Sequence, residues 1–499
     1  MMSPSLSRHL RESAFPLLIV FGVAGLFLLV LATGSVRALA SALFVVLGVV
    51  VAFGSGNPRL FALWGLMITI SLNLSKHFGP IVNKGGGETS FRAEVSDPFL
   101  IVLAAFLLRD LWQARMKGLQ IPRVTYLWLA IMAMGIATIV AGPWRTTAAH
   151  EVVRMLKMTL LFIVVTNELR TPGRMLHCLG GLVAGMLGQS VIGILQYARG
   201  ANLGLEILGE TSSKTIEVLA QNSLQSQKVW RVSGLLLHPN LFGIYLATLI
   251  PIAAGAFLLH VGRMSRAFFL AAAGAGTVAL IFTFSRSSWA SFAAAGVVLA
   301  AVAIRHRNLR GRSMRAGLVA ALTVVVIGIA FSGQIATRLF ESREDATLGR
   351  AQFEKDAMRM IWVKPWLGWG VNSYVHEVVP FLEHPVKAYS GWVPPVHNIY
   401  LLWWAETGIV GLIIHLWMWA AIGWTALQNL KVRDEVMYVA NAAALAGLIA
   451  FAVDGFLSFS LRINQPQRVF WVLAAMIMAV RYWRLRQPAP ALQPGKQDG

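Results

Sequence analysis

Residues 399–419 read IYLLWWAETGIVGLIIHLWMW, an almost unbroken apolar run that directly follows the polar segment Pro394–Asn398. A helix needs about 20 mostly apolar residues to cross about 30 Å of hydrocarbon. Because lipid offers the backbone no hydrogen-bond partners, we expect this run to be a membrane-spanning helix. Similar runs recur from Phe15 to Arg481, and we count about 14 of them.

The composition supports this interpretation. Of the 499 residues, 57% are hydrophobic and 13% are charged, and the mean hydropathy is +0.64. One water-soluble core could not bury so much apolar surface. We therefore predict an all-α, polytopic integral membrane protein with about 12 to 14 transmembrane helices over residues 1–486.

The net charge of +21 is explained by the position of the basic residues in alternate loops. Successive basic segments are separated by two spans, as the positive-inside rule requires if they all face the cytoplasm. Both termini are then cytoplasmic. No basic segment carries interleaved aromatics or a nucleic-acid-binding module, so we expect no nucleic-acid partner. The basic residues are Arg8, Arg11; Arg109, Arg115, Lys117, Arg123; Arg170, Arg174; Arg263, Arg266; Arg305, Arg307, Arg310, Arg312, Arg315; Lys431, Arg433; and Arg481, Arg484, Arg486.

The sequence offers no signal for a metal or cofactor. Cys178 is the only cysteine, so no disulfide and no thiolate metal site can form within the chain. There is no His-Glu-x-x-His motif, no Asp-x-Asp pair and no phosphate-binding glycine loop. The first span follows a basic start but is long and directly followed by another, so we expect an uncleaved anchor.

Two segments depart from a simple alternation of spans and short loops. The outer loop 332–396 is long and carries a predicted helix over Thr347–Trp362, with an apolar stripe of Leu348, Phe353, Ala357 and Ile361. We expect this helix to lie on the membrane surface or to cap the bundle. Residues 487–499 are predicted to form a disordered cytoplasmic tail.

The candidate functional residues all fall at the outer ends of spans. Arg231 ends an outer loop, His238 and Asn240 lie in the first turns of the next span, and Arg286 and His397 stand at two further outer ends. The membrane brings such positions to a similar depth, as a single site requires. Taken one by one, they also fit structural roles: an arginine can reach for headgroups, and an interfacial histidine can lack a partner.

His397 has the strongest case for chemistry. Pro394 and Pro395 cannot continue a helix, and Asn398 is a good capping residue, so the imidazole is expected beside a helix N-terminus. The positive end of the helix dipole disfavours the imidazolium form. A neutral, partly exposed histidine is suited to act as a general base.

Several polar residues lie within the apolar runs. Glu406 and Asp454 are carboxylates, which are costly in a membrane and usually face a partner. Glu406 is about half a turn from His397 around the helix, so we interpret it as the buried partner of an arginine. Gly408 returns to the face of His397 and would let a neighbouring helix approach closely. Arg154 and Lys157 could form a second phosphate contact or anchor headgroups, and we favour the second interpretation.

Five segments together resemble the O-antigen ligase and polymerase superfamily of bacterial envelope glycosyltransferases. The resemblance covers roughly Arg231 to Leu412, and its last segment is the most specific. The segments are RVSGL at 231–235, HPN at 238–240, TFSR at 283–286, PWLGWG at 365–370, and His397-Asn398 followed by Gly408.

The resemblance implies transfer of a glycan from an undecaprenyl pyrophosphate carrier to an acceptor hydroxyl on the periplasmic side of the inner membrane. In ligases the acceptor is the lipid A core of lipopolysaccharide, and in polymerases it is another sugar repeat. By this resemblance His397 would activate the acceptor, and Arg231 and Arg286 would hold the pyrophosphate. His238, Asn240, Asn398, Glu406 and Gly408 would support the site, and no metal or other cofactor would be required.

The sequence leaves three functions open. An O-antigen ligase is slightly favoured over a polymerase of O-antigen or exopolysaccharide repeats. A lipid or polysaccharide flippase is less favoured, because transport needs ionisable groups through the whole membrane depth and the inner halves of these spans are almost uncharged.

Overall fold

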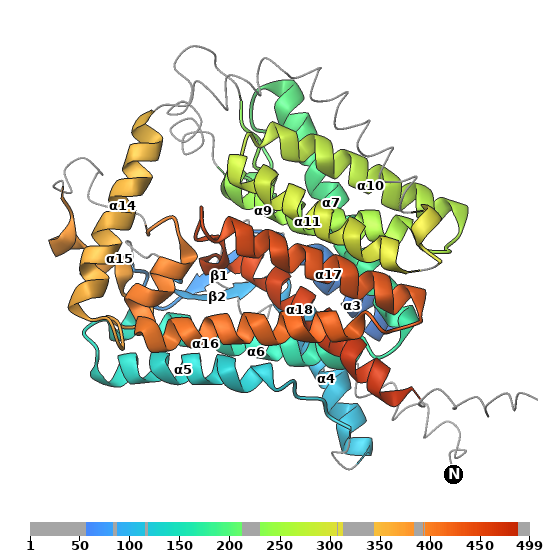
Figure 1. The fold of residues 1–499 in the computed structure, drawn as a ribbon, viewed down its shortest axis with the longest axis horizontal. Coiled ribbons are helices and arrows are strands. Elements are labelled where there is room, and N and C mark those ends of the chain that lie inside the picture. Colours follow the sequence, from blue (N-terminus) through green and yellow to red (C-terminus); the bar gives the residue numbers. More distant parts are fainter. Residues whose placement is uncertain are drawn as a thin grey trace, which may run out of the picture.

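The computed structural model describes residues 56–82, 87–114, 118–211, 230–306, 308–312, 344–383, 393 and 395–487. The predicted first anchor, the first part of the loop 332–396, Pro394 and the tail after residue 487 lie outside these ranges. Within them the chain is mostly helical (Figure 1). The α-helices are α3 (Pro58–Thr69), α4 (Asp97–Gln113), α5 (Val124–Ala141), α6 (Arg145–Glu168), α7 (Pro172–Arg199), α9 (Pro239–Phe257), α10 (Arg263–Phe282), α11 (Arg286–Arg305), α14 (Glu344–Val363), α15 (Tyr374–Glu377), α16 (Ile399–Asn429), α17 (Glu435–Asp454) and α18 (Asn464–Arg486).

The fold class agrees with the sequence prediction. In the part of the chain that the structure describes, seven helices are long and apolar enough to cross a membrane, namely α5, α7, α9, α10, α11, α16 and α17. The protein is therefore an all-α polytopic membrane protein.

The helices pack in two groups that meet at α17 and α18. Helices α7, α9, α10, α11 and α17 form one group, whereas α5, α6, α16 and α18 form the other, and α17 contacts α18 (Figure 1). Helix α18 is central, because every residue of the run VFWVLAAMIMAV at 469–480 is buried. A helix that is apolar on all sides is expected at such a position.

Two strands were not anticipated from the sequence. Strands β1 (Ser75–Phe78) and β2 (Phe91–Glu94) pair antiparallel, with Ser75 opposite Glu94. Short 3-10 helices complete the fold: η1 (Glu206–Leu208), η2 (Val379–Phe381) and η4 (Ser460–Arg462).

Basic residues from three of the predicted cytoplasmic segments lie close together. Arg170 is within electrostatic range of Arg486, and Tyr482 is within range of both Arg481 and Arg123. Three segments predicted to share one side of the membrane are thus close in space, as the alternation of basic loops requires.

Candidate active site

Arg231 joins two segments that are about 50 residues apart in sequence. Its Nε donates a hydrogen bond to the carbonyl oxygen of Thr283 at 2.9 Å, and an Nη atom donates to Oδ1 of Asn240 at 2.8 Å. The backbone N–H of Val232 donates to the carbonyl oxygen of Phe282 at 3.2 Å. Arg231, 6% exposed, therefore fixes the start of α9 against the turn that precedes α11.

That turn is strained. Phe284 has a φ of 48°, which is unfavourable for a residue with a Cβ, and its ring is buried. The ring lies 6.4 Å from both Tyr197 and Trp289, measured between centroids. The turn places Arg286 as the first residue of α11. Strained backbone of this kind persists where the surroundings hold it, often at functional sites.

His238 caps α9 and is held in one tautomer. Its Nδ1 accepts a hydrogen bond from the backbone N–H of Asn240 at 3.1 Å, so the proton of the neutral ring must be on Nε2. Burial, together with the nearby Arg231, His397 and Arg350, lowers the pKa of His238 to about 3. His238 is therefore a neutral hydrogen-bond donor at neutral pH.

His397 lies between two phenylalanine rings at the start of α16. Its ring centroid is 5.2 Å from that of Phe459 and 6.3 Å from that of Phe353. Nδ1 is buried and has no hydrogen-bond partner among the described residues. Burial, followed by the charge of Arg350, lowers the pKa of His397 to about 4. The direction is the one expected from the sequence, and burial is its first cause.

Asn398 caps α16 as predicted. Its Oδ1 accepts hydrogen bonds from the backbone N–H groups of Tyr400 at 3.1 Å and Leu401 at 3.2 Å. The cap fixes the first turn of the helix and with it the position of the preceding His397.

Arg350 was missed in the sequence analysis, although the structure places it among the predicted site residues. It is on α14 and lies within electrostatic range of both histidines. Burial, followed by the charge of Arg286, lowers its pKa, whereas Asp454 and Glu354 act in the opposite direction. A signal existed in the sequence, because Arg350 is three residues before Phe353 and so shares the apolar face of the predicted helix.

The predicted helix over Thr347–Trp362 corresponds to α14 and packs on the bundle. Its residues Ala357, Met360 and Ile361 are fully buried, and the helix contacts α16. The sequence allowed two positions for this helix, on the membrane surface or as a cap on the bundle. These contacts agree with a cap on the bundle. The packing directs the segment that carries Arg350 and Phe353 towards His397.

Asp454 ends α17 and is fully buried. The hydroxyl of Ser460 donates to its Oδ2 at 2.5 Å, and the side chain lies within electrostatic range of Arg350. The interpretation of Asp454 as a membrane carboxylate that faces a partner is confirmed. The carboxylate offsets part of the positive charge that the arginines bring to this site.

Gly408 lies apart from this cluster, at a break in α16 where φ is 65° and ψ is −175°. The segment Pro365–Gly370 fills the break. The N–H of Ile409 donates to the carbonyl oxygen of Pro365 at 2.8 Å, and the N–H groups of Trp369 and Gly370 donate to the carbonyl oxygens of Ala405 and Glu406, both at 2.9 Å. A Cβ on Gly408 would collide with the backbone of Trp366.

The prediction that Gly408 receives a neighbouring helix was therefore wrong in its partner. The close approach is made by a loop, and the helical face assigned to Gly408 does not exist because the helix is interrupted there. The loop and Gly408 were recognised separately in the sequence, whereas in the structure the loop forms backbone hydrogen bonds with the residues on both sides of Gly408.

Glu406 pairs with an arginine, which confirms its interpretation. Its Oε2 is 2.7 Å from an Nη atom of Arg462, and both side chains are buried. By contrast, the interpretation of Arg154 and Lys157 as headgroup anchors was wrong. Arg154 is buried against Glu151, and Lys157 forms ion pairs with Glu94 at 3.3 Å and Asp97 at 2.7 Å. Both bases neutralise buried carboxylates.

The chemistry available at this cluster follows from its groups. Arg286 and Arg350 can offer paired N–H donors to phosphate oxygens. Arg231 adds positive charge while its Nε and one Nη atom donate to Thr283 and Asn240, and His397 is a neutral base in the same cluster. Within the described ranges, no group of three or more His, Cys, Asp or Glu side chains is placed to hold a metal ion. The cluster is thus suited to bind a phosphate-bearing anion next to a group that can accept a proton.

Comparison with known proteins supports the resemblance seen in the sequence. A family model described as O-Antigen ligase matches residues 268–416, a range that includes Arg286, Arg350 and His397. A search of curated proteins found no match. The resemblance to the O-antigen ligase superfamily is therefore confirmed over this part of the chain.

Proposed function

We propose, from the match to the O-antigen ligase family over residues 268–416, that this protein moves a glycan from undecaprenyl pyrophosphate to an acceptor hydroxyl. The match supports a bacterial membrane glycosyltransferase of the ligase and polymerase type. Within that type we favour attachment to the lipid A core over polymerisation of repeats. The observation that carries the proposal is a neutral His397 within electrostatic range of Arg350, which in turn lies within range of Arg286.

The proposed reaction is a direct displacement. His397 takes the proton of the acceptor hydroxyl while its oxygen attacks the anomeric carbon of the donor. The bond from that carbon to the pyrophosphate oxygen breaks, and the electron pair leaves with the pyrophosphate. Arg231, Arg286 and Arg350 stabilise the charge that develops on the leaving group, and attack from the opposite face inverts the anomeric centre. His238, through its Nε2–H, can donate a further hydrogen bond to the same anion.

The reaction can be tested with purified protein in detergent. The assay combines an undecaprenyl pyrophosphate-linked glycan, lipid A core and EDTA, and products are separated on a gel. Glycan-bearing lipid A indicates a ligase, and lengthened lipid-linked glycan without lipid A product indicates a polymerase. If neither product forms, whether the acceptor is lipid A core or another lipid-linked glycan, the proposal is rejected.

We further propose that the site faces the periplasm, because the basic segments face the cytoplasm under the positive-inside rule. In a protein with Cys178 replaced, a single cysteine at Asp345 should react with a membrane-impermeant thiol reagent in intact cells, and one at Arg310 should not. The reverse pattern would put the site on the cytoplasmic side.

The transfer rate is expected to stay high in mildly acidic buffer. A base whose pKa is about 4 is almost fully neutral at about pH 5.5, whereas a histidine with an ordinary pKa near 6.5 is about 90% protonated there. Because the neutral form is the active one, the rate should fall only as pH decreases through about 4. Initial rates of the purified enzyme across this range check the prediction, and a midpoint near pH 6.5 would contradict it.

Replacement of Arg286 with lysine is expected to lower the transfer rate about 10- to 100-fold. Lysine keeps the charge but loses the two-point contact with phosphate oxygens. Arg305→Lys is a matched control, because Arg305 is at the other end of the same helix, and it should leave the rate unchanged. A normal rate in Arg286→Lys would mean that Arg286 only contacts lipid headgroups.

A further inference from the structure

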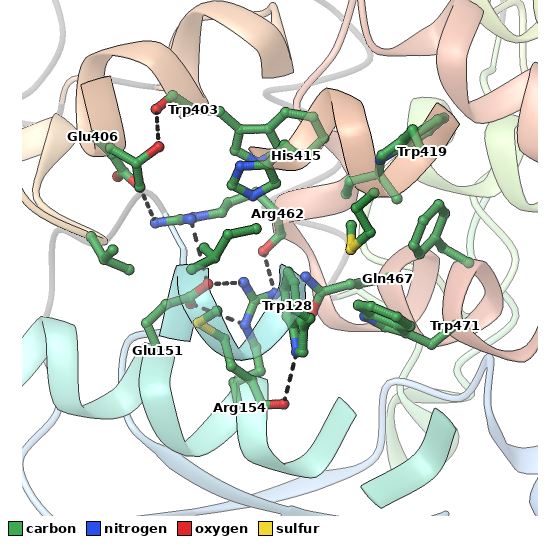
Figure 2. Close-up of a pocket in the computed structure, with 17 residues that line it drawn as sticks. Trp128, Glu151, Arg154, Trp403, Glu406, His415, Trp419, Arg462, Gln467 and Trp471 are labelled. Carbon is green, nitrogen blue, oxygen red and sulfur yellow. Dashed lines mark hydrogen bonds and ion pairs between the residues drawn. The ribbon is translucent and has the colours of Figure 1, made fainter. Parts of the chain in front are cut away.

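A second buried charge cluster lies away from the outer arginines. It contains Glu151, Arg154, Glu406 and Arg462, all of which line one cavity together with aromatic side chains (Figure 2). Arg462 is 2.7 Å from Glu406 and 3.4 Å from Glu151, and Arg154 pairs with Glu151. The cluster holds two positive and two negative groups.

This balance and the size of the cavity argue against a substrate site. A balanced cluster does not require an ionic guest, and the cavity volume of about 40 Å³ is far below the roughly 300 Å³ of small ligand sites. It has room for about three water molecules. Arg462 Nε, Gln467 Oε1 and Trp471 Nε1 border the cavity and have no protein partner among the described residues, so water can satisfy them.

The cluster joins four segments that are distant in sequence. Glu151 and Arg154 are on α6, Glu406 is on α16 and Arg462 is on η4. The fourth segment contains Asn372 and Tyr374 and follows the loop Pro365–Gly370. Arg462 donates a hydrogen bond to Oδ1 of Asn372 at 3.3 Å. The backbone N–H of Tyr374 donates to Oε1 of Glu406, also at 3.3 Å. In addition, Arg154 donates to the backbone carbonyl oxygen of Arg462 at 2.9 Å.

Arg462 therefore anchors the segment that forms one wall of the His397 site. Phe459, three residues earlier, packs edge-on against the imidazole at 5.2 Å between centroids, and Ser460 binds Asp454. Glu406, the main partner of Arg462, is on α16, the helix that follows His397, beside the break at Gly408. One guanidinium thus links the wall and the helix that hold the base.

We propose that Arg462 is a positioning residue that holds Phe459 and α16 around His397, an inference that rests on the proposed function. Its planar guanidinium meets Glu406, Glu151 and Asn372 at once, which a lysine ammonium cannot reproduce in the same geometry. Loss of these contacts loosens the wall formed by Phe459 and admits water to the imidazole.

The test compares Arg462→Lys with Arg468→Met. Arg468 is also buried, on α18, and pairs with Glu94 and Ser96, so its loss destabilises a buried ion pair and removes none of the contacts that Arg462 makes with Glu406, Glu151 and Asn372. For Arg462→Lys we expect kcat to fall about 10- to 100-fold with the donor KM unchanged. The acid limb of its pH profile should also move upward from about 4, because a hydrated His397 regains an ordinary pKa.

Arg468→Met should lower thermal stability and leave the pH profile in place. Glu406→Gln, which keeps a neutral partner for Arg462, should give a smaller effect in the same direction as Arg462→Lys.

A second measurement does not depend on activity. The rate at which diethyl pyrocarbonate modifies His397, followed by mass spectrometry, should rise several-fold in Arg462→Lys and stay at the wild-type value in Arg468→Met. Unchanged modification in a folded Arg462→Lys protein would overturn the inference. If wild-type protein transfers no glycan, the proposed function fails, and the modification rates still decide whether Arg462 positions the imidazole.

Discussion

Replacement of His397 with alanine is expected to abolish glycan transfer while the protein still inserts and folds. A positioned general base contributes about 10²- to 10⁴-fold to a rate. The neighbouring His238 is not placed to substitute for it, because its Nδ1 already accepts the N–H of Asn240. The imidazole packs between Phe353 and Phe459, so its removal costs some packing but no ion pair. Product formation by purified protein, with normalised amounts of enzyme, measures the effect.

His260→Ala provides the control for this experiment. His260 is largely exposed and pairs with Glu435 at the far end of α17 from Asp454. This variant should retain the wild-type rate. A His397→Ala protein with full activity would remove the base from the mechanism and leave only the arginine cluster.

Replacement of Gly408 with alanine is expected to prevent assembly of the native structure. Alanine is disfavoured at a φ of 65° and a ψ of −175°, a region that is essentially restricted to glycine, at a cost of about 1 to 3 kcal/mol. The larger effect is steric, because the new Cβ would overlap the backbone of Trp366. The loop Pro365–Gly370 would have to leave the break, and its hydrogen bonds to α16 would be lost. A total loss above about 4 kcal/mol follows.

Expression, membrane insertion and thermal unfolding in detergent would show this effect. Gly423→Ala is the matched control, since Gly423 is on the same helix and a Cβ there meets no atom within 4 Å. That variant should assemble normally. Equal stability of the two variants would mean that α16 can straighten without its loop.

The comparison of sequence and structure shows which features are local. The cap at Asn398 and the partner of Glu406 follow from short-range geometry and from the cost of charge in a membrane, and both were predicted. Lys157 was misinterpreted because its partners, Glu94 and Asp97, are about 60 residues away, and a single sequence does not reveal such pairs. The prediction that Gly408 lies on the same helical face as His397 assumed 3.6 residues per turn along the whole helix. The break at Gly408 makes this assumption invalid there.

Arg350 shows a different limit. A lone arginine in an amphipathic helix usually lies on the solvated face, so residue type alone argued against it. Its spacing from Phe353 was the better signal, and only the packing of α14 on α16 revealed its position. The strained turn at Phe284 had no sequence signal, because a non-glycine residue gave no reason to expect a positive φ.

The backbone bonds between the break in α16 and residues 365–370 have a consequence for how a donor of the proposed kind could reach the site. They tie the carboxyl end of α14 to α16, so the two helices cannot separate at this end without losing these bonds. A lipid-borne donor must therefore enter by a route that leaves this junction intact.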